Sequence, residues 1–362
     1  MNTFITDPRL TPIKEKITAG IRLDAGDGII LYQSHDIIGI GRLADFVRRK
    51  RHGNKAFFIY NQHLNYTNVC VNHCRFCAYS RKKGEDGAFT LSIDDVTEKL
   101  MARIDEPIRE IHMVGGINPA LPFEYYLDLL NTIREIRPNA TIKAFTAVEI
   151  DHLAGISGLS LEDAIQKLKD TGLAMTPGGG AEVMSHRVRE QLFPRKIGQE
   201  RWLEVVRKIH EAGLTSNATM LYGHIETIEE RVEHLIHLRS LQDQTGGFSA
   251  FIPLAFHSRN TRLSHLPSTT AHDDLKAVAI ARLMLDNFDH IKAYWVMIGE
   301  KLAQIALNFG ADDLDGTIIE EKITHMAGAT SSKGLTRENI QNMIRSGGFD
   351  PVERDSFYRE IG

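Results

Sequence analysis

The sequence predicts a closed α/β barrel of the (β/α)8 type. Short apolar runs rich in β-forming residues alternate with amphipathic helical patterns, and eight such runs can be counted along the 362 residues. Regular alternation of this kind indicates a parallel sheet. A flavodoxin-like open sheet is the alternative, but eight units in one undivided chain fit a closed barrel better. We expect a helical extension at 1–50, the barrel at 51–320 and a helical C-terminal extension packed on it at 321–362.

Each predicted strand and helix follows from the local pattern. The strands are expected at 55–60, 108–114, 141–148, 173–176, 215–222, 248–255, 290–297 and, more weakly, 311–319. Helical patterns lie between them at 93–104, 123–137, 161–171, 200–212, 228–245, 271–287 and 299–309, and two more occupy 10–21 and 34–51. Active sites of such barrels lie where the strands end at their carboxyl side. The residues that follow each strand are therefore the first candidates for function.

Composition excludes several classes of partner. The hydrophobic fraction of 42% and the charged fraction of 25% are those of an ordinary globular protein. A net charge of −4 gives no indication of nucleic-acid binding. No apolar run approaches the roughly 20 residues that span a bilayer, and no signal peptide is recognised. We expect a cytoplasmic protein with neither a nucleic-acid nor a membrane partner.

All three cysteines of the chain, Cys70, Cys74 and Cys77, fall within eight positions. Thiolates are soft ligands that suit iron–sulfur clusters and zinc. A [4Fe–4S] cluster normally takes four cysteines, so a cluster here would leave one iron without a protein ligand. A closed zinc site is the alternative, with His73 or His63 as its fourth ligand. The odd number of cysteines argues against disulfides.

The spacing CxxxCxΦC, with Phe76 at the aromatic position, resembles that of radical S-adenosylmethionine (SAM) enzymes. The resemblance implies that the amine and carboxylate of SAM chelate the open iron of a [4Fe–4S] cluster. An electron from the cluster then cleaves SAM to a 5′-deoxyadenosyl radical. It also implies that Phe76 packs near the adenine, and we place Phe76 and Tyr79 in the SAM site.

The resemblance implies SAM-binding roles for glycine and glutamate residues at strand ends. Gly115 and Gly116 follow the second strand. They could form a simple turn, but the resemblance implies that this segment binds the SAM amino group, where glycine permits close approach. Glu149 follows the third strand and could be a helix N-terminal charge; the resemblance suggests a contact with the ribose hydroxyls. The glycine run 178–180 indicates either backbone against a ligand or a mobile loop.

Candidate substrate residues also follow strands. His224 and His257 come directly after the fifth and sixth strands and are candidate catalytic residues. Asn217, Tyr222 and Asn260 could line the same barrel mouth. Arg81, just past the cysteines, is a further candidate for binding an anionic substrate, as are Arg189 and Arg195 after the fourth strand. The histidines of the helical patterns, His210, His234 and His237, are expected to face solvent or to pack.

Segments spread over nearly the whole chain resemble the menaquinone-pathway radical SAM group. This group contains aminofutalosine synthases, dehypoxanthine futalosine cyclases and the coenzyme F420 precursor synthases. The resembling segments are 65–70, 177–182, 216–227, 241–248, 251–257 and 310–316. The run Pro-Leu-Ala-Phe-His ending at His257 is similar to the synthases, because the cyclases tend to carry Gln there. Ser258 departs from the expected Pro, which changes the rigidity of this loop.

The resemblance implies a carbon–carbon bond-forming transferase. The deoxyadenosyl radical adds to the double bond of 3-[(1-carboxyvinyl)oxy]benzoate, a carboxylate is lost, and SAM is consumed as a co-substrate. The site must hold two carboxylates and exclude water, with His257 and His224 as candidates for carboxylate contact or proton handling. An electron donor such as flavodoxin or ferredoxin is implied. A hydrogen-abstracting enzyme such as the cyclase and a zinc-stabilised binding protein are the alternatives.

Overall fold

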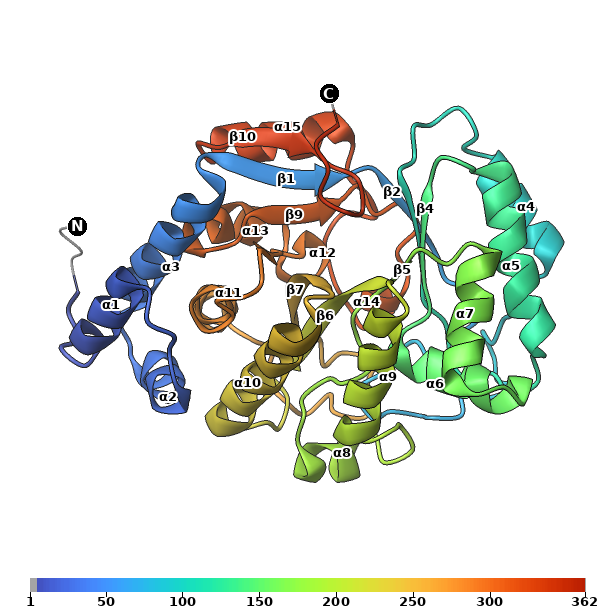
Figure 1. Cartoon of the computed structure of the whole chain (residues 1–362), viewed down its shortest axis with the longest axis horizontal. Coiled ribbons are helices and arrows are strands. Elements are labelled where there is room, and N and C mark those ends of the chain that lie inside the picture. The colour runs from blue at the N-terminus through green and yellow to red at the C-terminus, as the bar shows by residue number, and fades with distance from the viewer. Residues whose placement is uncertain (1–4, 362) are drawn as a thin grey trace.

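The structure is a computed structural model that describes residues 5–361. Its centre is a curled parallel sheet of seven strands in the order β2-β3-β4-β5-β6-β7-β8 (Figure 1). The strands are β2 (Asn61–Leu64), β3 (Glu110–Met113), β4 (Thr141–Ala144), β5 (Met175–Thr176), β6 (Thr215–Tyr222), β7 (Phe248–Ala255) and β8 (His290–Ile291). Each pairs with its neighbour in sequence, so the chain winds around the sheet in one direction. The predicted α/β barrel class is confirmed.

Two further strands span the interval between β8 and β2. Strand β1 (Lys55–Ile59) runs directly into β2 and pairs in parallel with β9 (Asp313–Gly316). Single bridges join Lys292 to Asp313 and Gln62 to Ile319. The eight predicted strand regions therefore follow one another around the barrel, although β9 is joined on its β8 side by a single bridge and not by a ladder.

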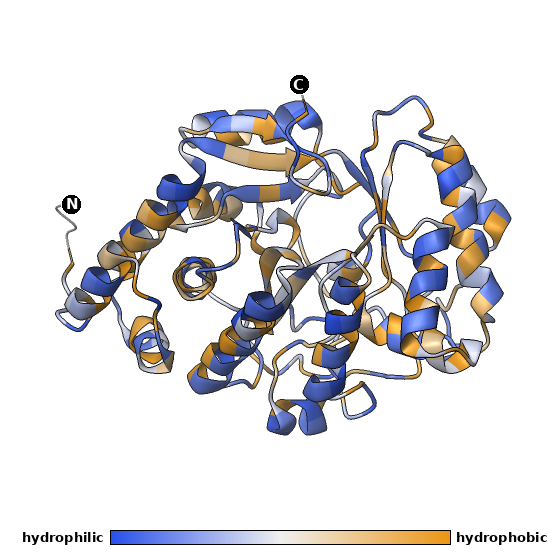
Figure 2. Cartoon of the chain, in the orientation of Figure 1, coloured by the Kyte–Doolittle hydropathy of each residue, from blue (hydrophilic) through white to orange (hydrophobic). Residues whose placement is uncertain are grey.

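The helices surround the sheet and turn their apolar sides toward it, as Figure 2 shows. In α9, for example, Trp202, Val205, Val206 and Ile209 are buried. The helices after the cysteine loop are α4 (Ile93–Met101), α5 (Phe123–Ile136), α6 (Ala147–Ser157), α7 (Leu161–Thr171), α8 (His186–Leu192), α9 (Gln199–Glu211), α10 (Ile228–Thr245), α11 (Ala271–Met284), α12 (Trp295–Ile298) and α13 (Glu300–Ala306), followed by the 3-10 turn η1 (Leu307–Phe309).

Six of the eight predicted strands are shorter in the structure, and for two of them the local structure gives the reason. The run predicted at 141–148 stops at Ala144, because Thr146 caps helix α6 in a capping box with Glu149. The run predicted at 290–297 is a strand only over its first two residues, and its apolar remainder forms the buried helix α12. Periodicity alone does not separate a short buried strand from a short buried helix.

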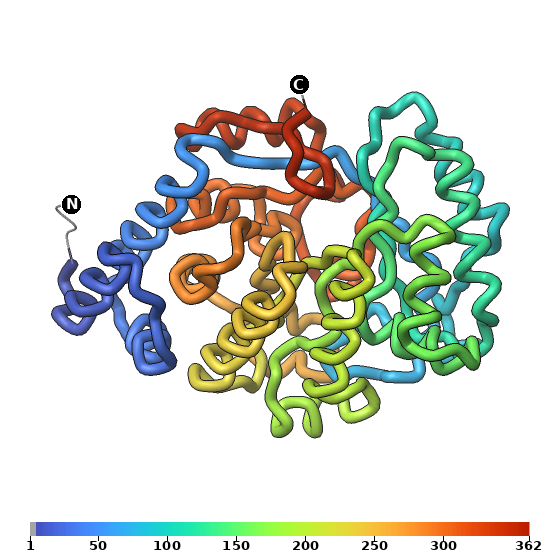
Figure 3. The backbone as a smooth tube through the Cα atoms, in the orientation of Figure 1, coloured from blue at the N-terminus to red at the C-terminus, as the bar shows by residue number. Residues whose placement is uncertain are grey.

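Both extensions differ in detail from expectation. The first 50 residues contain α1 (Leu10–Ala19), α2 (Ala25–Gln33) and α3 (Ile37–His52), and α2 lies between the two helical patterns that the sequence predicts. The C-terminal extension contains α14 (Ile323–Met326) and α15 (Arg337–Ser346), but it ends in a strand, β10 (Asp350–Glu353). Strand β10 pairs in parallel with β1, and Figure 3 shows this last part of the chain beside the blue segment that carries β1. The expected helical extension is therefore present, but its last segment is a strand. The tail strand is short, polar and contains Pro351, which hides it from pattern analysis.

Across the described residues, no helix combines the length and the apolar composition that a membrane span requires.

Candidate functional site

A pocket opens at the carboxyl ends of the strands, where barrel active sites lie. It is lined by the loop after β2 and by residues that follow β3, β4, β5 and β7. Nine of the residues singled out from the sequence line it together: Cys70, Cys74, Phe76, Cys77, Tyr79, Gly115, Gly116, Glu149 and His257.

Backbone hydrogen bonds fix the cysteine loop. The Cys70 N–H donates to the Arg81 carbonyl at 3.0 Å, and the Val71 N–H donates to the Ile117 carbonyl at 3.0 Å. Burial raises the pKa of the Cys74 thiol to about 12 and also raises the pKa of Cys77. Thiolates in such surroundings require a compensating positive charge, which bound iron supplies.

The residues present fit a three-cysteine iron–sulfur cluster better than a closed zinc site. The zinc alternative needs His73 or His63 beside the three thiols. Neither histidine lines the pocket that the cysteines line. His63 instead lies deeper in the barrel, with its ring stacked on that of His112 at 4.5 Å between centroids.

Gly116 allows the cluster loop to lie against the end of β3. A Cβ at this position would fall 2.3 Å from the Val69 carbonyl oxygen and 2.9 Å from the Cys70 Cβ. At Gly115 a Cβ would fall 2.4 Å from the Tyr66 ring. Both glycines are therefore required by the packing of the protein itself. Their expected contact with SAM remains a prediction, and both line the pocket.

Glu149 connects three strand ends. Its Oε1 accepts hydrogen bonds from the Tyr66 hydroxyl at 2.6 Å and from the Gly115 N–H at 3.0 Å. Its Oε2 accepts from the Thr146 N–H at 2.8 Å and from the Thr146 hydroxyl at 2.7 Å. Burial raises the pKa of Glu149, whereas four donors favour its ionised form. Glu149 therefore caps helix α6 and lines the pocket at the same time. The sequence alone presents these two roles as alternatives.

Lys196 is a pocket residue that the sequence did not reveal. Its ammonium group pairs with Glu182 and lies 5.3 Å from the centre of the Phe76 ring. Burial alone would lower the pKa of Lys196, but Glu182 and the nearby Cys74 hold it above its ordinary value. No motif marks this lysine. The sequence points instead to the neighbouring Arg189 and Arg195, whose guanidinium groups bind loop carbonyls.

His257 reaches the pocket with a defined tautomer. Its Nε2 lies 2.8 Å from the Met297 carbonyl oxygen. Because a carbonyl can only accept, the neutral ring carries its proton on Nε2 and keeps Nδ1 as an acceptor.

Four predicted residues, His224, Tyr222, Asn260 and Arg81, line neither this pocket nor the deeper chamber described below. His224 is buried, with Nδ1 2.8 Å from Glu226. The Tyr222 hydroxyl donates to Asp274 at 2.8 Å on the outer side of β6, because successive strand residues face opposite ways and Leu221 takes the inward position.

The other two bind loop backbone. Asn260 is exposed and donates to the Met326 carbonyl at 3.0 Å. Arg81 donates to the carbonyls of Ala78 and Ser80 at 2.8 and 2.9 Å. Arg81 therefore supports the chain that follows the cysteines.

A second, deeper chamber continues from the pocket into the barrel. The two share six lining residues: Val114, Gly178, Leu254, Met297, Ile323 and Thr324. Asn217, predicted as a substrate residue, lines the chamber, as do His63, His112, Thr219 and Tyr294. Burial lowers the pKa of His63 to about 3 and also lowers that of His112. The pair is therefore neutral and presents imidazole groups rather than charges. These histidines come from two different strands, and no sequence pattern joins them.

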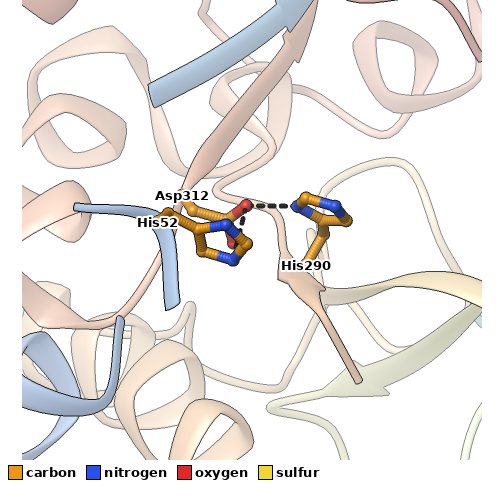
Figure 4. Close-up of side chains that lie close together, drawn as sticks. All are labelled: His52, His290 and Asp312. Atoms are coloured by element: carbon orange, nitrogen blue, oxygen red, sulfur yellow. Dashed lines mark hydrogen bonds and ion pairs between the residues drawn. The ribbon is translucent and has the colours of Figure 1, made fainter. Parts of the chain in front are cut away.

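A separate cluster at the opposite end of the barrel consists of His52, His290 and Asp312 (Figure 4). The His290 Nδ1 lies 2.5 Å from Asp312 Oδ2, and the His52 Nε2 lies 3.6 Å from the same oxygen. Arg282 pairs with the other carboxylate oxygen. Since a guanidinium already balances this buried carboxylate, the cluster is an ion-paired network and not a vacant metal site.

Comparison with known proteins agrees with this geometry. Residues 64–238 match the radical SAM superfamily, and residues 245–361 match the CofH/MqnC C-terminal region. The aminodeoxyfutalosine synthase of Thermus thermophilus is 46% identical over 99% of this chain and 97% of its own length. That of Streptomyces coelicolor is 42% identical, over 96% and 92%. A cyclic dehypoxanthine futalosine synthase of Streptomyces coelicolor is 36% identical, over 97% and 89%.

Solved structures show the same fold. Methylornithine synthase superposes with a TM-score of 0.75 at 17% identity, covering 94% of this chain and 97% of that one. A maturase of the [FeFe]-hydrogenase gives a TM-score of 0.74 at 18% identity, covering 96% and 77%. With Cys70, Cys74 and Cys77 gathered in one pocket, the match to the family model and the full-length relatives show that the chain belongs to the radical SAM superfamily, whose members use a [4Fe–4S] cluster and SAM.

Proposed function

We propose that the chain is an aminodeoxyfutalosine synthase of the futalosine route to menaquinone. It would join the adenosyl carbons of SAM to 3-[(1-carboxyvinyl)oxy]benzoate with loss of a carboxylate. The observation that carries the proposal is the 46% identity to the Thermus thermophilus synthase over nearly the whole of both chains. The presence of His257 at the pocket, at the end of the run that distinguishes synthases from cyclases, supports it.

Different residues of the pocket would bind the cluster, SAM and a substrate carboxylate. Cys70, Cys74 and Cys77 would hold the cluster, which when bound supplies the electron that cleaves SAM. Gly115, Gly116 and Glu149 form the wall beside it, where we expect SAM. Lys196 is the one lysine or arginine among the described residues that line this pocket, and it would supply the positive charge for a carboxylate there.

The deep chamber suits the aromatic part of the substrate. Neutral His63 and His112, together with Asn217, Thr219 and Tyr294, offer hydrogen-bond donors to a polar group of the substrate. The carboxylates of Asp315 and Glu321 also line the chamber, and they pair with Lys292 and His325. The Thr219 hydroxyl has no partner among the described residues. Buried polar groups without partners are costly, so a ligand that satisfies them would gain affinity. Because the chamber is reached through the pocket, bound substrate would also shield the radical from water.

One chromatographic run tests the proposal. The anaerobically reconstituted and reduced protein is given SAM and the enolpyruvyl ether of 3-hydroxybenzoate. A product whose mass includes the adenosyl carbons is expected, with methionine released in equal amount. His257→Ala should lower turnover while iron content stays at the wild-type level, because His257 bonds only to the Met297 carbonyl.

The futalosine cyclase is the second candidate, favoured by the relative that is 36% identical. An enzyme that abstracts hydrogen would release free 5′-deoxyadenosine in step with product and would form no adduct. If the wild-type protein gave that result, the cyclase and not the synthase would be the proposed function. Either chemistry needs a one-electron donor, and we propose a reduced flavodoxin or ferredoxin for this role.

A further inference from the structure

Basic side chains gather on the outer surface around the cysteine loop. Five of them form what we call the basic rim: Arg75, Lys82, Lys83, Arg195 and Arg262. All five are exposed. None of the five pairs with an acidic residue in the described part of the chain, whereas nearby Arg187 and Arg201 pair with Glu230 and Asp151.

Hydrogen bonds hold the segments of the rim together. The Arg195 guanidinium donates to the Val71 carbonyl at 3.1 Å, one residue from Cys70. The Arg75 N–H donates to the Leu192 carbonyl at 2.8 Å, and the Arg262 N–H donates to the Arg75 carbonyl at 3.0 Å. The rim is therefore built from three segments that are far apart in the sequence.

The same three segments share a small apolar cluster beneath the rim. Cys74 is one of its members, together with Leu192, Phe193 and Leu263. The rim thus lies directly over a predicted cluster ligand. An apolar side chain, that of Val71, is 39% exposed beside the Arg195 guanidinium, which binds the Val71 carbonyl.

The positive charge of the rim contrasts with the negative net charge of the whole chain. The whole chain carries a net charge of −4, whereas the acidic groups in the sequence next to the rim, Glu85, Asp86 and Glu190, are fewer than the rim cations. Two of these acids already have partners: Glu85 accepts a hydrogen bond from the Lys82 N–H, and Glu190 lies 3.6 Å from His186. Unpaired cations gathered around an exposed apolar side chain are typical of a surface that meets an oppositely charged protein.

We propose that the basic rim is the docking surface for an acidic one-electron carrier protein. The inference rests on the proposed function, which requires one electron for each SAM cleaved. In the encounter, the reduced carrier is oxidised by one electron and the cluster is reduced by one. Complementary charge accelerates such an encounter, by about 10- to 1,000-fold at low salt.

The test uses a triple charge reversal, Lys82→Glu, Lys83→Glu and Arg262→Glu. The side chains of these residues make no hydrogen bond within the described chain, so their loss leaves the loop contacts of Arg75 and Arg195 in place. The control is Lys50→Glu, Lys167→Glu and Arg345→Glu, which changes the net charge equally. Those three residues are exposed near the ends of α3, α7 and α15, each of which leads into the start of a strand at the opposite end of the barrel.

Cluster reduction is followed by absorbance at about 410 nm in the full-length reconstituted protein. Reduced flavodoxin is one reductant, and dithionite, which needs no docking surface, is the other. We expect the flavodoxin rate constant of the rim variant to fall at least tenfold at low salt and to lose much of its salt dependence. The dithionite rate, the iron content and the behaviour of the control variant should stay at the wild-type level.

Three outcomes would overturn the proposal. These are an unchanged flavodoxin rate in the rim variant, an equal loss with dithionite, or an equal loss in the control variant. The milder set Lys82→Gln, Lys83→Gln and Arg262→Gln should give an intermediate fall in the flavodoxin rate constant. It serves as the test if the charge-reversal variant does not fold. Because the readout is cluster reduction, the identity of the organic product does not affect the result. Failure of dithionite to bleach the wild-type protein would instead overturn the cluster chemistry on which both proposals depend.

Discussion

Replacing Gly116 by alanine should separate the cluster loop from the end of β3. The new Cβ would lie 2.3 Å from the Val69 carbonyl oxygen, whereas ordinary contact begins near 3.4 Å. The loop must therefore retreat by about 1 Å. The obstructing atom belongs to the backbone, so no side-chain rotation relieves it. Forcing one methyl group into a packed site costs about 1–3 kcal/mol.

The Cys70 Cβ would also lie close to the new methyl group, at 2.9 Å, so the displacement should act on a cluster ligand. We expect Gly116→Ala to retain less than half of the wild-type iron after anaerobic reconstitution. Gly155→Ala is the matched control, because Gly155 lies within α6 and a Cβ there would meet no atom within 4 Å. Alanine at this position should stabilise the fold by about 0.5–1 kcal/mol.

Iron content decides between two explanations of Gly116. If the glycine served only to admit SAM, the variant would bind full iron and would lose SAM affinity alone. Full iron with an unchanged cluster spectrum would therefore refute the packing argument. A loss of iron in Gly155→Ala as well would show that the assay reports general instability.

Three other outcomes are expected. Cys74→Ala should lose most iron and all SAM cleavage, and retention of both would contradict its assignment as a ligand. Glu149→Gln turns an amide donor toward groups that also donate, which should cost about 1–3 kcal/mol in the free energy of unfolding; denaturant titration measures it. For Asp312, burial alone would raise the pKa, but His290 and Arg282 hold it below its ordinary value. Its contribution to stability is present above the unfolded pKa of about 4 and declines as pH falls below it. The stability gap between wild type and Asp312→Asn should thus narrow on acidification below that pH, and a constant gap would argue against the ion pair.

Strand prediction succeeded where the apolar run coincided with the whole strand. Strands β6 and β7 have the predicted bounds, 215–222 and 248–255. Both are long, buried runs. Strand β8 is only two residues long, because the apolar residues after it pack as a helix. A buried strand and a buried helix are equally apolar at this length, so the sequence carries no signal that separates them.

The site was predictable where its geometry is local. Three ligands within one loop are evident from their spacing, and the following glycines lie where a parallel strand must end. Side-chain direction at a strand end was not predictable in the same way. Leu221 faces the pocket and Tyr222 faces Asp274, and a shift of one residue would exchange them. Lys196, His63 and His112 meet the site from separate segments, so only the fold brings them there.

The contacts of Glu149 suggest that the cluster loop and the expected SAM wall form one mechanical unit. One carboxylate binds the Tyr66 hydroxyl, which belongs to the chain leading to Cys70, and the Gly115 N–H, which belongs to the wall. The Gly116 N–H then donates to the Thr67 carbonyl at 2.9 Å, joining the same two segments again. A change in either segment must therefore displace the other, and iron content and SAM affinity should vary together in variants of Gly116 and Glu149. His257 lies outside this network and is held by the Met297 carbonyl alone. Its substitution should therefore alter turnover while both iron and SAM remain bound.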